Sequence, residues 1–155
     1  MPRNQRGITI LEVTLVLMLT SIVMMGLVGF YLHSQATWLE SSSQAITQRD
    51  ATLALERIAE RVRAASRAVT PVPGTLVLYD RGGTEMHRFW LEPSDSLLHH
   101  GVGGTVDDGP LVNSRVVRFD VSADTALVTV TSLVLAGPHG ASIEARSGAA
   151  LYNRP

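Results

Sequence analysis

The feature that most constrains this chain is an uninterrupted apolar run close to its N-terminus. Residues 13–32 form a stretch of 20 residues without a charged side chain. At 1.5 Å per residue, a helix of this length spans about 30 Å, which is the thickness of the hydrocarbon core of a bilayer. The run therefore predicts a membrane-spanning helix.

The residues on either side of the run predict its orientation in the membrane and whether it remains in the mature protein. Arg3 and Arg6 are the only basic residues before it. Because cytoplasmic flanks of membrane helices carry an excess of basic residues, we expect the N-terminus to lie in the cytoplasm. A secretory signal has a shorter apolar core, followed by a cleavage site of small residues. Residues 30–35 contain no such site, so we expect the segment to remain in the mature protein.

One carboxylate, Glu12, lies at the edge of the apolar run. A charged side chain at the bilayer centre costs about 2.5–3.5 kcal/mol on insertion scales, so such a residue normally has a partner. No lysine, arginine or histidine lies between Ile8 and Leu32. A backbone amine would be the nearest cation if the chain were cut between Gly7 and Ile8. In the alternative interpretation, Glu12 lies at the depth of the lipid headgroups and is solvated.

Residues 7–12, which read Gly-Ile-Thr-Ile-Leu-Glu, resemble the processing motif of type IV pilins and of type II secretion pseudopilins. That family has a short basic leader, a glycine before the cut, a hydrophobic residue after it and a glutamate fifth in the mature chain. Glycine suits a cut site because it lacks a Cβ and lets a peptidase approach the backbone. The resemblance implies that a prepilin peptidase removes residues 1–7 and that Ile8 is then N-methylated. It also implies that Glu12 pairs with the N-terminus of a neighbouring subunit.

The residues after the membrane segment predict more helix. An apolar stripe follows the 4-3-4-3-4 spacing of one helix face, and Pro71 and Pro73 then stop the helix. The stripe consists of Ala51, Leu55, Ile58, Val62, Ala65 and Val69.

The serine-rich residues 34–50 leave two interpretations open. They form either a flexible linker between a membrane helix and a separate amphipathic helix, or part of one helix from Ile8 to about Ala68. The resemblance favours one helix, with residues 8–32 in the membrane and in the assembled filament and residues 33–70 outside the membrane. Gly26 and Gly29 are the expected bend points, because glycine weakens a helix and this part of the chain has no proline.

Residues 74–155 predict an antiparallel β-rich domain. Strands are expected at residues 75–80, 84–91, 115–122 and 125–135, with a last strand at 141–146 or 149–152, and a glycine-containing hairpin turn at 81–83. Residues 101–110 are expected to be loop by composition.

In the strand at 115–122, the alternation places Val117, Phe119 and Val121 on one face. The expected fold class is α+β and pilin-like, with the long N-terminal helix packed on a small C-terminal antiparallel sheet that covers its apolar stripe.

Composition argues against several classes of function. The chain has no cysteine, and its net charge of −1 gives no electrostatic footprint for nucleic acid. No nucleophile elbow, phosphate-binding loop or His-x-x-x-His spacing occurs. We therefore expect no enzyme activity and no cofactor. Asp107 and Asp108 are weak candidates for calcium, and His99 and His100 are expected on opposite faces of a strand.

The resemblance also predicts a role. Residues 55–63 and 149–154 are similar to those of J-type minor pseudopilins and PilW-like minor pilins. The expected function is a non-catalytic minor subunit that primes or caps a pseudopilus for type II secretion. It would lie in the bacterial inner membrane, with its C-terminal domain in the periplasm.

The expected partners are the lipid bilayer, other major and minor pseudopilins or pilins, the prepilin peptidase and the inner-membrane assembly platform. Two alternatives remain open at this point. One is a minor pilin of a type IV pilus, used for adhesion, twitching or DNA uptake. The other is a periplasmic binding domain held by a signal anchor, for which Gly7 and Glu12 would be incidental.

Overall fold

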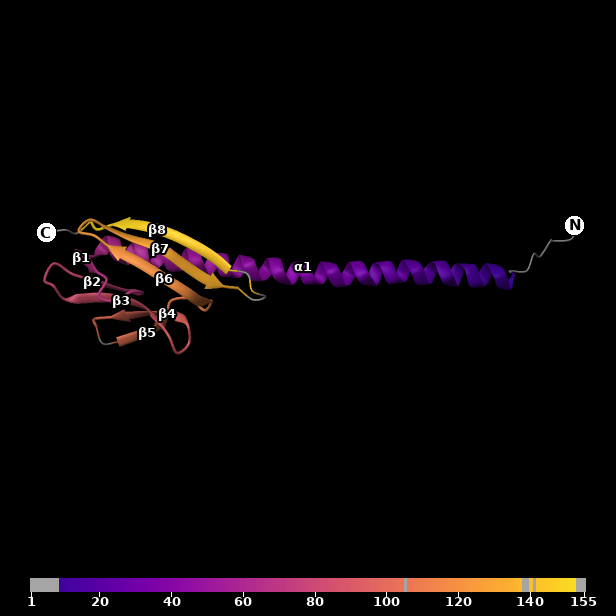
Figure 1. Cartoon of the computed structure of the whole chain (residues 1–155), viewed down its shortest axis with the longest axis horizontal. Helices are drawn as coiled ribbons and strands as arrows, with labels where there is room; N and C mark the ends of the chain where they lie inside the picture. The colour runs from indigo at the N-terminus through magenta and orange to yellow at the C-terminus, as the bar shows by residue number, and fades with distance from the viewer. Residues whose placement is uncertain (1–8, 105, 138–139, 141, 153–155) are drawn as a thin grey trace, which may run out of the picture. The chain divides into compact units, whose positions relative to one another are not determined.

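The structure is a computed structural model that describes residues 9–104, 106–137, 140 and 142–152 (Figure 1). One α-helix precedes eight strands, which form a five-stranded sheet and a three-stranded sheet, both antiparallel. The α+β class expected from the sequence is therefore confirmed. The elements are α1 (Ile10–Ala64), β1 (Arg67–Val69), β2 (Thr75–Tyr79), β3 (Glu85–Glu92), β4 (Leu97–Val102), β5 (Val106–Pro110), β6 (Arg115–Ala123), β7 (Leu127–Ala136) and β8 (Ser142–Ala150).

Helix α1 is continuous through the serine-rich stretch, so the linker interpretation is wrong. The chain divides after Ser41 into two compact units, residues 1–41 and residues 42–155. In the serine-rich stretch the helix accommodates a hydroxyl by local bonding, because Thr47 donates to the carbonyl of Ser43 at 3.0 Å. The single helix that the resemblance favoured is therefore observed, from Ile10 to Ala64.

The helix ends at Ala64, four residues before the expected end at Ala68. Its last turn tightens, with the amide of Ala65 bonding the carbonyls of Arg61 and Val62. The chain then forms β1, which pairs with β2. Val69, expected on the helix stripe, therefore lies in a strand, because the β2 ladder offers the backbone partners that a further helical turn would have supplied.

The five-stranded sheet has the order β1-β2-β3-β4-β5. The expected hairpin between β2 and β3 is confirmed, with Gly83 at φ 79° and the Asp80 carboxylate accepting from the amide of Thr84 at 2.7 Å. The expectation of loop at residues 101–110 is wrong at Gly101 and Val102, which complete β4, and at Val106–Pro110, which form β5, whereas Gly103 and Gly104 form a turn. Glycine suits position 101 because an added Cβ would lie 3.0 Å from the Val106 carbonyl oxygen and 3.1 Å from the Trp90 ring.

The three-stranded sheet has the order β6-β7-β8. A register shift between Val116 and Arg118 marks a β-bulge in β6. The bulge inverts the expected alternation, so Val116 is buried while Val117 is 59% exposed. The expected position of Val117 on the core face is therefore wrong, whereas Phe119 is buried as expected.

A single hydrophobic core joins α1 to both sheets. Five of the six residues of the expected stripe contribute to it, with Leu55 half-buried and Ala51, Ile58, Val62 and Ala65 buried. Ala54 and Ala59 are also buried, and these small side chains let the helix approach the strands closely. The sheets contribute the larger groups, including Leu76, Leu78, Phe89, Leu98, Val116, Phe119, Val128, Val130, Leu133 and Leu135.

Two polar contacts fasten α1 to the segment that connects the sheets. The Asp50 carboxylate accepts from the amide and the hydroxyl of Ser114, at 3.1 and 2.7 Å. The Arg57 guanidinium donates to the carbonyl of Leu111 at 3.0 Å. The connection between β5 and β6 is thereby held on the helix.

Two isoleucines of α1 give a matched test of this core. Ile58 is 2% exposed and Ile46 is 62% exposed. We expect Ile58→Ala to lower the free energy of unfolding by about 2–5 kcal/mol, because it leaves a cavity in the core. Ile46→Ala should change it by less than about 0.5 kcal/mol. Chemical denaturation of the detergent-solubilised chain, followed by near-UV circular dichroism, measures both, and equal losses would contradict the described core.

Candidate functional site

The first part of α1 is apolar on every side. Residues 10–32 are all exposed in the chain by itself, including Ile10, Leu11, Met25 and Phe30. An 18-residue window of α1 has a mean hydropathy of 2.3. A helix that is hydrophobic all round requires an apolar surrounding. This helix is long and apolar enough to cross a membrane as a single-pass anchor.

Polar side chains within this apolar segment are satisfied by the helix itself. The hydroxyls of Thr14, Thr20 and Ser21 donate to the carbonyls of Leu11, Val16 and Leu17 at 2.7 to 2.9 Å. In lipid, an unpaired hydroxyl would cost free energy, whereas these groups need no partner outside the helix.

The helix begins at a capped N-terminus. The amide of Glu12 bonds the Thr9 carbonyl at 3.0 Å and the Thr9 hydroxyl at 3.3 Å, so Thr9 is the N-cap. Thr9 and Glu12 have the spacing of a capping box, a signal that the sequence analysis missed. A carboxylate in the first turn also interacts favourably with the helix dipole. Local helix chemistry therefore accounts for part of the placement of Glu12.

The Glu12 carboxylate itself has no hydrogen-bond or ion-pair partner among the described residues. It is exposed and lies on one helix face with Val13, Val16 and Leu17. A single negative charge therefore stands at the edge of an apolar surface. The other residues of the expected processing site, Arg3, Arg6, Gly7 and Ile8, lie outside the described residues.

The two glycines expected to bend the helix lie within continuous α-helix. An added Cβ at Gly26 or Gly29 would meet no atom within 4 Å. Glycine is therefore not required at either position by the packing of this chain alone. The proposed bend stays a prediction.

The weak calcium candidates Asp107 and Asp108 lie in β5 rather than in a loop, and their carboxylates contact different groups. Asp107 accepts from the amide of Gly109 at 2.9 Å and contacts His99, whereas Asp108 lies 3.4 Å from Nδ1 of His100. Within residues 9–104, 106–137, 140 and 142–152, no group of three or more acidic or histidine side chains could hold a metal ion.

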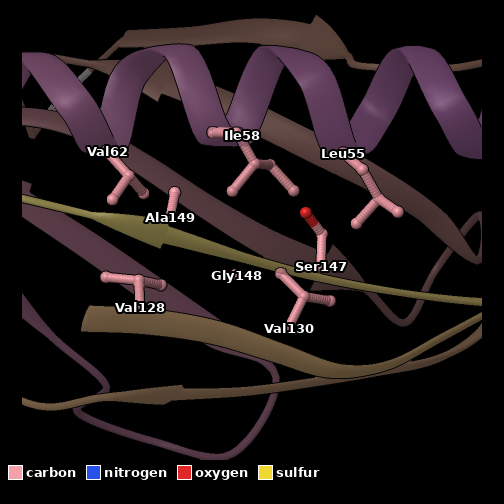
Figure 2. A pocket seen from close by; sticks show the side chains of 9 residues that line it. Leu55, Ile58, Val62, Val128, Val130, Ser147, Gly148 and Ala149 are labelled. Carbon is pink, nitrogen blue, oxygen red and sulfur yellow. The ribbon is translucent and has the colours of Figure 1, made fainter.

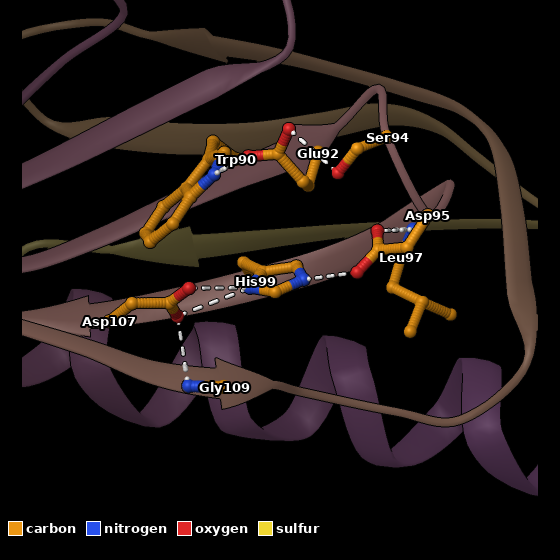
Figure 3. A network of polar contacts seen from close by, with 8 residues as sticks. All are labelled: Trp90, Glu92, Ser94, Asp95, Leu97, His99, Asp107 and Gly109. Carbon is orange, nitrogen blue, oxygen red and sulfur yellow. Dashed lines mark hydrogen bonds and ion pairs between the residues drawn. The ribbon is translucent and has the colours of Figure 1, made fainter.

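The adjacent histidines lie on opposite faces of β4, as expected. His99 is 8% exposed, and its two ring nitrogens contact the carboxylates of Asp95 and Asp107, each at 2.9 Å (Figure 3). Its ring lies 5.6 Å from that of Trp90. Burial disfavours the charged imidazolium, but the hydrogen bonds to the two carboxylates outweigh it and raise the pKa of His99.

His100 lies on the other face, stacked on Phe89 with 5.0 Å between ring centroids. Its Nε2 contacts Nδ1 of His87 at 3.1 Å. Burial, the positive charge of Arg61 and the neighbouring His100 lower the pKa of His87. One face of this sheet therefore favours a charged imidazole and the other a neutral one.

Comparisons of the chain with protein-family models, with curated proteins and with solved structures find no match.

The raised pKa of His99 predicts a pH-dependent contribution to stability. This contribution is complete below the unfolded-state pKa of about 6.5 and is lost as the pH rises through the higher folded-state pKa. We expect His99→Gln to cost about 1.5–3 kcal/mol at about pH 5.5, and clearly less at about pH 9. Unfolding of both chains at the two pH values, with His33→Gln as an exposed control, tests this. Equal losses at both values would mean that folding does not raise the pKa of His99.

Proposed function

We propose that this chain is a non-catalytic subunit of a membrane-assembled filament, a minor pseudopilin of the J-type or PilW-like kind. The observation that carries the proposal is Glu12, the single charged side chain among residues 10–32, the part of α1 that is apolar on every side. Residues 7–12 resemble the pilin processing motif, and cleavage at this motif would create an α-amine at Ile8. The amine of a neighbouring subunit is the partner that we propose for the Glu12 carboxylate.

In this proposal, a prepilin peptidase hydrolyses the peptide bond between Gly7 and Ile8 and creates a new α-amine, which is then methylated. The subunit remains in the inner membrane through its apolar helix, with the domain at residues 42–155 in the periplasm. When subunits stack on the assembly platform, the Glu12 carboxylate pairs with the cationic N-terminus of a neighbour. Such pairing removes an uncompensated charge from an apolar environment, and so favours incorporation.

The architecture supports a role through contacts rather than catalysis. The apolar segment offers a helix surface that neighbouring helices or lipid can cover, and the C-terminal unit has its own core. Secretion and pilus systems use the same subunit architecture, so the proposal extends to a minor pilin of a type IV pilus. Neighbouring genes distinguish them, since a retraction ATPase indicates a pilus and a set of pseudopilins with a secretin indicates secretion.

Processing gives the first test. The intact mass of the chain extracted from membranes of its native host should correspond to residues 8–155 with one added methyl group. Gly7→Leu should leave the leader in place, because a branched side chain obstructs the approach of the peptidase to the backbone. A wild-type chain that still begins at Met1, in cells with active prepilin peptidase, would contradict the proposal and favour a signal-anchored domain.

The role of Glu12 can be separated from helix capping. Glutamine also serves at this position of a capping box, so Glu12→Gln keeps the cap and removes the charge. We expect Glu12→Gln to insert and fold normally, but to lose most co-purification with partner subunits. Loss of one member of a buried ion pair costs about 3–5 kcal/mol, equivalent to a large drop in occupancy.

Two further variants complete this test. Glu12→Asp keeps the charge and should retain part of the co-purification, whereas Thr9→Ala weakens only the cap and should retain nearly all of it. If Glu12→Gln co-purifies as well as the wild type while the leader is still removed, the pairing role is wrong and capping suffices.

A further inference from the structure

The strand β8 is the longest uncovered sheet edge among the described residues. The order of the sheets leaves β1, β5, β6 and β8 at edges. β1 has only three residues, and β5 has five and ends at a proline. β6 is covered because it packs on the five-stranded sheet, where the amide of Val116 donates to the carbonyl of Ser96 at 2.7 Å. β8 has nine residues and no proline, and pairs along its length with β7 only.

A long open edge offers backbone hydrogen bonds to another chain. Each strand of an antiparallel ladder directs alternate N–H and C=O groups to either side, so half of those of β8 face away from β7. Native proteins usually shorten, cover or charge such edges, because an unpaired edge accepts further strands. The edge of β8 is charged only at Glu144 and Arg146, which bond each other at 2.9 Å.

Beside this edge lies a groove of about 310 Å³ between β8 and α1. Its floor is apolar, with Leu55 half-buried and Ala59 8% exposed. On the strand side it is lined by Arg146 and Ser147. Further in, Figure 2 shows Ser147, Gly148 and Ala149 beneath the helix. A gap of only about 10 Å³ continues inward between the helix and the sheet, so the inner part is packed and the space lies at the edge.

The charges of the groove indicate what would occupy it. Arg63 on α1 and Arg146 on β8 both line it, together with the carboxylate of Glu56. Arg146 already bonds Glu144 at 2.9 Å, whereas Arg63 makes no ion pair with the described residues. The β8 positions that face the core side, Ile143, Ala145 and Ser147, carry no carboxylate. A second copy of β8 would therefore leave Arg63 uncompensated.

We propose that an extended segment of another polypeptide adds to β8 as a fourth strand and occupies this groove. Its helix-facing side chains are apolar where they cover Leu55 and Ala59 and include a carboxylate where they meet Arg63. Addition of a strand to a sheet edge is a general mode of peptide recognition, in which the backbone gives affinity and alternate side chains give specificity. This surface is separate from Glu12, so the proposal holds or fails independently of the assembly role.

A selection experiment tests the occupant. A library of random decapeptides displayed on phage is selected on the full-length chain in nanodiscs, with empty nanodiscs removing lipid binders. We expect enrichment of sequences with apolar residues at every second position and one carboxylate within that same alternate set, where it can meet Arg63. No enrichment, or enrichment without that period, would overturn the proposal.

The best enriched peptide is then synthesised and its affinity is measured by fluorescence anisotropy. The double variant Arg63→Glu and Arg146→Glu should weaken binding by about tenfold or more, whereas Arg115→Glu, an exposed arginine away from the groove, should leave it unchanged. Equal affinity for all three chains would place the peptide elsewhere and overturn the proposal.

N-methylated peptides test the strand pairing without altering the protein. Methyl groups on the amides that face β8 should abolish binding, whereas methyl groups on the alternate amides should have little effect. Equal effects of the two sets would contradict addition to an edge. Sedimentation of the full-length chain in detergent tests the other occupant of the β8 edge. Dimerisation that is lost in Arg146→Glu would show that a second copy of this chain pairs with β8, and would overturn the proposal.

Discussion

The domain at residues 42–155 depends on the close approach of one helix face to two sheets. Three of the six buried residues of α1 are alanine, namely Ala51, Ala54 and Ala59, so the backbone of the helix lies near the strands. The bulk of the core comes from the sheets, through side chains such as Phe89 and Phe119. The two sheets also pack on each other, because β6 contacts β2, β3 and β4. The helix face and both sheets therefore share one core.

The same helix meets two kinds of surrounding along its length. Up to about Leu32 it is apolar on every side, whereas from Thr47 onward only one stripe is buried and the remainder carries charged side chains. Hydrophobicity on every side indicates an environment of lipid or other helices, and a stripe indicates a single packed face. One continuous helix thus joins two segments. The first, up to about Leu32, requires lipid or other helices around it, whereas the second packs its apolar stripe on the sheets of the same chain.

Periodic patterns in the sequence predicted the elements whose signals are local. The helix stripe, the hairpin at residues 81–83 and the opposite orientation of His99 and His100 follow from spacing alone. The prediction that Val117 lies on the core face is wrong because a β-bulge adds a residue to β6, and no local sequence pattern indicates that bulge.

Other features depend on contacts between distant residues. Residues 101–110 have the composition of a loop, yet Gly101 and Val102 pair with β3, and Val106–Pro110 pair with β4. The end of α1 was set by β2 in the same way. At the candidate site, the sequence places Glu12 in a motif at residues 7–12, but it does not identify the cationic group that pairs with the carboxylate. The contacts of Asp95 and Asp107 with His99 required the fold to bring three separate positions together.

The contacts that fasten α1 to the C-terminal half have a consequence for the order of folding. Asp50 and Arg57 bond residues that follow more than 50 positions later, and the helix stripe packs on β7 and β8, the last strands of the chain. Closing such long loops costs entropy before the contacts form. A chain that is synthesised from its N-terminus therefore cannot complete its core before β8, its final strand, is available to the helix.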